Sequence, residues 1–118
     1  MEDLNRIGRA TGTEAKAAEM TAGLTARIES VIERAKDADK HPSVLHVEWA
    51  DPVMCAGHWV PEMTEMAGGT NSFGDKETGT LELDWDEVVA SQPEIIIMMQ
   101  CGFDVKRALE DMPLMKSK

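Results

Sequence analysis

Side chains suited to binding or catalysis are concentrated in one stretch of this 118-residue chain, between Trp49 and Trp59. An indole stands at each end, and the side chains between them include a carboxylate, a thioether, a thiol and an imidazole, from Asp51, Met54, Cys55 and His58. A thiolate beside an imidazole can hold zinc or act as a nucleophilic pair. Indoles can form the flat apolar wall of a site for a large planar ligand. The stretch is therefore either a site or a cover on the core.

The chemical pair within this stretch is a weak signal. Cys55 and Cys101 match no zinc or thioredoxin spacing, and only Cys55 with His58 has the close spacing of structural zinc ligands. His46 lies within an apolar run, where we expect it to be buried and hydrogen-bonded. We therefore expect no metal site and no catalytic residue. Two free thiols, or a disulfide between them, are the simpler expectation, and an enzyme using Cys55 and His58 stays as an alternative.

Two apolar runs predict the strands that position these side chains. Residues 43–49 are rich in β-formers, and residues 94–99 are the most apolar run, which predicts a central strand of a parallel sheet. The carboxyl ends of parallel strands share one edge of the sheet, where ligands bind in α/β folds. The loops at 50–58 and 100–104 should therefore meet there. Those loops and their ends carry Asp51, Cys55, His58, Trp59, Cys101 and Phe103.

Four helices are expected around these strands. A capping box at residues 11–14 predicts a long helix over 12–37, after a weakly patterned start. A second helix should begin near 58–60, with Pro61 in its first turn, and end at a glycine pair. One face of this helix is apolar, which is more typical of a core than of a ligand site. That face carries Trp59, Met63, Met66 and Ala67.

The last two helices are expected to be short. Asp84 should cap one that runs through Ala90, and Asp104 should cap the other. Pro113 should end this final helix, because proline breaks the helical hydrogen-bond pattern. Its apolar face carries Val105, Ala108, Leu109 and Met112.

Length and composition restrict the class of protein. A chain of 118 residues with 42% hydrophobic and 29% charged residues corresponds to one soluble globular domain at most. Its net charge of -10 would repel a phosphate backbone or an anionic membrane, so we expect no nucleic-acid partner. No apolar run reaches the roughly 18 residues of a membrane span. Because the N-terminal residues given are polar and acidic, we expect no signal peptide among them.

Several longer motifs resemble those of a known family. They are Ile7-Gly-x-x-Thr-Gly12, Glu48-Trp-x-Asp-Pro-x-x-x-x-Gly-x-Trp-x-Pro-Glu-Met63, Ala67-Gly-Gly-x-Asn71, Trp85-x-Glu-Val88, Gln92-Pro-Glu-Ile-Ile96 and Cys101-Gly-Phe-Asp104. Together they resemble the substrate-binding proteins of ABC importers for vitamin B12 and ferric siderophores, and the B12-type branch is closest. The match covers nearly the whole chain, and the combination of motifs is specific.

The resemblance implies an α/β fold, a parallel-sheet Rossmann-like lobe with one long N-terminal backbone helix. Residues 1–40 correspond to the interlobe helix with its N-terminal tail, and residues 41–118 to part of the C-terminal ligand-binding lobe. The chain is then incomplete relative to the two-lobe family fold. The loops at 49–59 and 101–103 would line the ligand cleft. The candidate contacts are Trp49, Asp51, Met54, Cys55, His58, Trp59, Cys101, Gly102 and Phe103.

The resemblance also implies a ligand and partners. The ligand would be a cobalamin-like corrinoid or another metal chelate, bound without catalysis. The protein would deliver it to an ABC importer permease, from the periplasm or from an extracellular lipid anchor. Family members dock through a carboxylate on each lobe, and Glu65, Asp75 and Glu77 are the candidates here. A lone lobe with unpaired sheet edges would also associate with itself, so we expect a homodimer.

Overall fold

The structure is a computed structural model that describes residues 1–116. Its contacts divide the chain into two compact units, Met1–Ala38 and a second unit that begins at Asp39. Within residues 1–116, no helix is both long enough and apolar enough to cross a lipid bilayer. The assignment of the first unit to an interlobe helix and of the second to a ligand-binding lobe stays a prediction.

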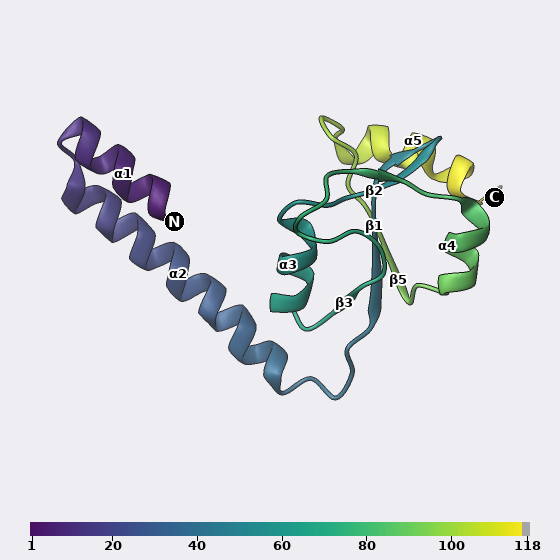
Figure 1. Ribbon diagram of the computed structural model, residues 1–118, viewed down its shortest axis with the longest axis horizontal. Helices are drawn as coiled ribbons and strands as arrows, with labels where there is room; N and C mark the ends of the chain where they lie inside the picture. The colour runs from purple at the N-terminus through teal and green to yellow at the C-terminus, as the bar shows by residue number, and fades with distance from the viewer. Residues whose placement is uncertain (117–118) are drawn as a thin grey trace. The chain divides into compact units, whose positions relative to one another are not determined.

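The first unit is a helical hairpin, in which the predicted long helix is preceded by a shorter one. Its helices α1 (Glu2–Thr11) and α2 (Glu14–Lys36) lie side by side, as Figure 1 shows. Gly12 ends α1 with φ 69°, a left-handed conformation that glycine adopts without steric strain. The helices approach so closely that a Cβ on Gly8 would lie 2.4 Å from the Cβ of Ala17. The long helix predicted over 12–37 is confirmed by α2, whereas α1 was not predicted. Thr13 takes the N-cap position of α2 without a side-chain capping hydrogen bond, so the capping box predicted at 11–14 is wrong.

The second unit contains a mixed five-stranded sheet centred on β1 (Ser43–Ala50). β1 pairs in parallel with β3 (Thr70–Asn71) and with β5 (Ile95–Met98). It pairs antiparallel with β2 (Val53–Cys55), and β2 pairs antiparallel with β4 (Leu81–Glu82). The α/β class is thus confirmed, and both predicted strands are present.

The sheet differs from the expected parallel one in two segments. The chain after β1 was expected to be a loop, but it turns back into β2, so Trp49 pairs with Met54. The polar segment after α3 (Val60–Met66) contributes the short strands β3 and β4. Both differences come from two- or three-residue strands that are too short to produce a recognisable alternation of polar and apolar residues.

The core of this unit forms around β1. Leu45 and Val47 have no exposed surface, and they pack with Val53, Cys55 and Val88. β5 was expected to be a central strand but lies at an edge, where within residues 1–116 it pairs with β1 alone. Its three isoleucines are consequently 42%, 47% and 42% exposed, in the order Ile95, Ile96 and Ile97.

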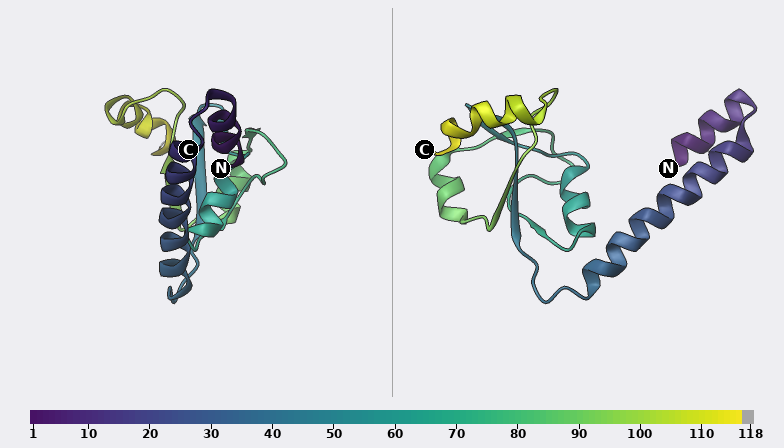
Figure 2. Two further views of the ribbon diagram at one scale, coloured as in Figure 1. Left: turned by 90° about the vertical axis from the view of Figure 1, so that its left-hand side faces the viewer. Right: turned by 180° about the vertical axis from the view of Figure 1, so that it is seen from behind.

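Two helices follow the expected end signals. The Asp84 carboxylate accepts a hydrogen bond from the Asp86 N–H at 2.7 Å at the start of α4 (Trp85–Ser91). The Asp104 carboxylate accepts one from the Arg107 N–H at 2.8 Å at the start of α5 (Val105–Lys116). Figure 2 shows α3 and α5 on opposite sides of β1. The helices therefore cover both faces of the sheet near its central strand.

The buried side of α3 is not the predicted one. Val60, Pro61 and Thr64 are buried, whereas Trp59 and Met63 are 68% and 60% exposed. Proline in the first turn of α3 agrees with the prediction. The apolar stripe that begins at Trp59 is therefore a surface feature and not part of the core.

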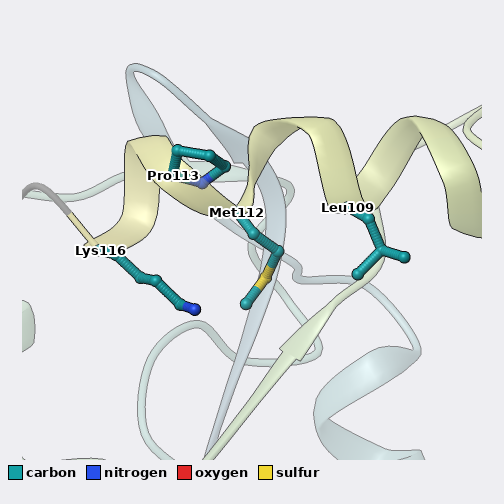
Figure 3. A pocket seen from close by; sticks show the side chains of 4 residues that line it. All are labelled: Leu109, Met112, Pro113 and Lys116. Atoms are coloured by element: carbon teal, nitrogen blue, oxygen red, sulfur yellow. The ribbon is translucent and has the colours of Figure 1, made fainter.

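α5 also differs from its prediction. Pro113 lies inside the helix, which continues to Lys116. Leu109 and Met112 do not enter the core. Together with Pro113 and Lys116 they line an open apolar groove of about 600 Å³ (Figure 3). None of the predicted site residues lines this groove, so it lies apart from the candidate site.

Candidate ligand-binding site

The two predicted loops meet at the carboxyl ends of β1 and β5. These strands are parallel neighbours, so the segments that follow them leave the sheet at the same edge. There the rings of Trp49 and Phe103 meet edge to face, with centroids 5.7 Å apart and planes inclined by 60°. The structure thus brings together one aromatic side chain from each loop.

Trp49 presents a fixed apolar surface at this edge. Its indole N–H donates a hydrogen bond to the Asp51 carbonyl oxygen at 3.1 Å, while 43% of the residue remains exposed. Edge-to-face contacts add roughly 0.5–1.5 kcal/mol beyond the area they bury. A ring held in this way needs little ordering when a flat ligand stacks against it.

A guanidinium group completes this part of the site. The central carbon of the Arg107 guanidinium lies 5.1 Å from the centroid of the Phe103 ring, an arrangement that favours a cation over the ring face. Arg107 Nη1 donates to Glu110 Oε2 at 2.9 Å, and Nη2 lies 3.7 Å from Asp111 Oδ1. Trp49, Phe103 and Arg107 therefore form one apolar and cationic surface, called here the edge cluster.

Gln100 is a buried side chain that supports the edge cluster through Asp111. It is only 5% exposed, and its amide nitrogen donates to Asp111 Oδ2 at 3.4 Å. Its Oε1 atom is buried and has no hydrogen-bond partner among the described residues. Because Asp111 also faces Arg107, this contact helps to hold the guanidinium above Phe103. Neither Arg107 nor Gln100 was predicted, and helical spacing could not have indicated the pair of Phe103 and Arg107, because α5 begins only at Val105.

A second aromatic pair follows β2. The rings of His58 and Trp59 stack with centroids 5.7 Å apart and planes inclined by 28°, and both residues are exposed. The loop that holds them is clamped, since His58 N–H donates to the Thr78 carbonyl at 2.8 Å. At Gly57 a Cβ would lie 2.2 Å from the Gly79 carbonyl oxygen, so only glycine fits there. No ring contact within residues 1–116 joins this pair to the edge cluster.

The two cysteines do not form a site together. Cys55 is 1% exposed and packs in the core, whereas Cys101 is exposed, and both are free thiols. The expected alternative of a disulfide between the loops is therefore absent from the described residues. Burial raises the pKa of the Cys55 thiol, which favours the protonated form over a nucleophilic thiolate. As a predicted ligand contact, Cys55 lies beneath the surface rather than on it.

The remaining predicted contacts lie around the edge. Met54 is half-buried opposite Trp49 in the hairpin, and Asp51 is exposed at its turn. Gly102 is exposed with φ 77°, which suits glycine in the turn before Phe103. Their roles as ligand contacts stay predictions, as do those of His58, Trp59 and Cys101.

Two of the three predicted docking carboxylates lie close together. Glu65 and Asp75 line the same surface hollow of about 520 Å³ beside α3, and Glu77 lies outside it. N–H donation from Glu77 and Thr78, each at 2.8 Å, lowers the pKa of the Asp75 carboxyl and favours its charged form. The docking role of these residues stays a prediction.

The family is established by comparison with known proteins. A family model described as periplasmic binding protein matches residues 1–115. The chain belongs to the periplasmic binding protein family. This confirms the family resemblance read from the motifs. A search of curated proteins finds no match to the sequence.

Solved periplasmic binding proteins share the fold. An ABC transporter substrate-binding protein from Listeria monocytogenes EGD-e matches with a TM-score of 0.85 at 17% identity, over 99% of this chain and 46% of its own. The heme-binding protein RhuT from Roseiflexus sp. RS-1 matches with a TM-score of 0.76 at 20% identity, over 94% of this chain and 44% of its own. An Fe3+-hydroxamate transport protein from Saccharomonospora viridis DSM 43017 matches with a TM-score of 0.73 at 24% identity, over 95% of this chain and 40% of its own. The chain thus spans less than half the length of these relatives.

Proposed function

We propose that this chain is part of the solute-binding component of an ABC importer, and that the edge cluster contacts the solute. The observation that carries the proposal is the contact of Trp49 with Phe103 beneath Arg107, at the carboxyl ends of two parallel strands. This is the position at which α/β sheets bind ligands. In this role the protein works on the outer side of the cytoplasmic membrane, in the periplasm or on a lipid anchor.

The chemistry of the edge cluster favours a flat or bulky metal chelate that carries acidic groups. Trp49 and Phe103 offer apolar ring surface, and Arg107 offers the only cation that contacts either ring in the described residues. Two of the structural relatives are a heme-binding protein and a protein of an Fe3+-hydroxamate transport system. We therefore propose haem, a ferric hydroxamate or a cobalamin-like corrinoid as the ligand class. Binding alone is proposed, with no reaction.

Tryptophan fluorescence tests this proposal, because Trp85 serves as an internal control. Trp85 packs against the core and belongs to neither loop. A Trp59→Phe, Trp85→Phe variant reports on Trp49 alone, and a Trp49→Phe, Trp59→Phe variant reports on Trp85 alone. Hemin, a ferric hydroxamate and cobalamin are added to each. We expect saturable quenching that is stronger for Trp49 than for Trp85 with at least one chelate.

Arg107→Gln should weaken binding of an acidic chelate by roughly tenfold, the size of a lost charge-assisted hydrogen bond. Lys106→Gln is the matched control, since it removes the same charge from the neighbouring exposed position of α5. Equal, non-saturable quenching of both tryptophans by all three chelates up to high micromolar concentration would overturn the proposal. A hydrolase activity that is lost in Cys55→Ala but kept in Cys101→Ala would instead favour the enzyme alternative.

We further propose that the hollow containing Glu65 and Asp75 docks on a basic side chain of the importer permease. Its support is the closeness of two carboxylates on one exposed surface. Glu65→Lys with Asp75→Lys should abolish binding to the detergent-solubilised permease, while Glu87→Lys on α4 should not. Undiminished binding of the double variant would place docking elsewhere.

A homodimer is also proposed, and β5 is the observation that favours it. Within residues 1–116, the three isoleucines of β5 are exposed and the strand pairs with β1 alone. Sheet edges of this kind are common sites of association between chains. Light scattering on the full chain at tens of micromolar tests the dimer, and the mass of a monomer would overturn it.

A further inference from the structure

We infer that Glu110 competes with the acidic group of the solute for the Arg107 guanidinium, and so sets how strongly the edge cluster prefers acidic chelates to neutral ones. The inference rests on the proposed chelate binding at the edge cluster and names a residue that determines its specificity. Its basis is that Arg107 already has two carboxylate partners within the protein. Glu110 Oε2 accepts a hydrogen bond from Nη1 at 2.9 Å, and Asp111 Oδ1 lies 3.7 Å from Nη2.

The two carboxylates differ in how firmly the rest of the protein holds them. The side chain of Asp111 is 18% exposed, and its Oδ2 atom accepts a hydrogen bond from the amide of buried Gln100 at 3.4 Å. The side chain of Glu110 is 52% exposed, and among the described residues Arg107 is its only hydrogen-bond or ion-pair partner. Asp111 is therefore a fixed partner of the guanidinium, whereas Glu110 is free to turn away into water.

The contact between Arg107 and Glu110 is a local property of α5. Residues three apart on a helix are neighbours on its surface. Both residues lie within Val105–Lys116, and the Arg107 N–H donates to the Asp104 carboxylate at 2.8 Å, which fixes the first turn of the helix. The pair is therefore set by the helix itself rather than by the elements around it.

The charges around the guanidinium explain why an acidic solute has to compete. One cation is shared by two carboxylates, so this group of side chains carries a negative net charge. An acidic group that approaches Arg107 is repelled until one carboxylate leaves. Exposed ion pairs contribute little free energy, so the release of Glu110 costs little. A neutral chelate that only stacks on Trp49 and Phe103 requires no such exchange.

Titration of two chelates into Glu110→Gln tests the competition, in the Trp59→Phe, Trp85→Phe protein that reports on Trp49 alone. One chelate is hemin, which carries carboxylates, and the other is a ferric trihydroxamate without charged groups. Glu110→Gln should tighten hemin binding by about threefold, the size of one exposed ion pair, and leave binding of the neutral chelate unchanged. Glu87→Gln is the matched control, since it removes the same charge from an exposed position of α4.

An Arg107→Gln background separates competition from a general effect of charge. If Glu110 acts through Arg107, Glu110→Gln should tighten hemin binding only where the arginine is present. Far-ultraviolet circular dichroism checks that all variants are folded. Saturable hemin binding that Glu110→Gln leaves unchanged, or tightens equally in both backgrounds, would overturn the inference and leave chelate binding intact. Absence of saturable hemin binding would also overturn it, whereas the proposed function fails only if the hydroxamate and cobalamin do not bind either.

Discussion

β1 and β5 are adjacent strands with similar sequences and very different surroundings. Both are apolar and rich in branched residues, and they pair residue for residue from Val44–Ile95 to Val47–Met98. Yet Leu45 of β1 has no exposed surface, whereas its partner Ile96 is 47% exposed. The reason is position in the sheet, since among residues 1–116 β1 has strands on both sides and β5 has a strand on one side. Apolar sequence predicts that a strand forms, but its neighbours decide how much of it is buried.

The same comparison explains where the candidate site lies. β1 is a rigid central element, so the ring of Trp49 at its end is held at a defined position. β5 leads into the loop and helix that carry Phe103 and Arg107. The edge cluster therefore joins the ends of a largely buried central strand and a largely exposed edge strand. A chelate bound at this cluster would contact residues that follow from both strands.

The largest expected effect comes from truncation in β1. Leu45→Ala should lower the free energy of unfolding by about 3 kcal/mol, because a fully buried leucine leaves a cavity that the surrounding core only partly fills. Urea unfolding followed by circular dichroism measures this loss. A change below about 1 kcal/mol would show that β1 is not the packed strand of the comparison.

The corresponding substitution in β5 should lower the free energy of unfolding much less. Ile96→Ala should cost about 1 kcal/mol or less at concentrations where the protein is monomeric, since nearly half of the side chain already lies in water. The same urea unfolding is used, so the two losses are directly comparable. Equal losses in the two variants would break the contrast between the strands.

A smaller change in the free energy of unfolding is expected with pH, and of the two strands only β1 should cause it. His46 is 8% exposed and its Nδ1 atom has no hydrogen-bond partner among the described residues. Burial lowers the pKa of His46 below its usual 6.5, so the folded protein holds it neutral. The unfolded chain then binds more protons below pH 6.5, and stability is lost as the pH falls through that value. β5 carries no ionisable residue to produce such a change.

The measurement compares unfolding free energies of wild-type protein and His46→Gln at about pH 7 and pH 5. The wild-type protein should lose more stability than the variant on acidification. An equal loss in both would mean that His46 is solvated or protonated in the folded state. Other titrating groups contribute to both proteins and cancel in the difference.

Sequence reasoning predicted the edge at which the site lies better than the residues that form it. Trp49 and Phe103 follow from two strands and one topological rule, and their rings are in contact. Cys55 was predicted beside them because it belongs to the same stretch, but the β2 hairpin turns its side chain into the core. Arg107 was overlooked because its contribution depends on the first turn of α5 passing over Phe103. Local pattern cannot specify either contact.

The sequence by itself determined the family, the α/β class, the two main strands and the caps of α4 and α5. These features depend on short-range periodicity, on end signals and on motifs that stand together in the chain. Only the tertiary structure decided that the N-terminal segment is a hairpin, that Trp59 is exposed and that β5 lies at an edge. Each of these depends on which distant element supplies or withholds a neighbour, and burial is set by that neighbour rather than by the residue itself.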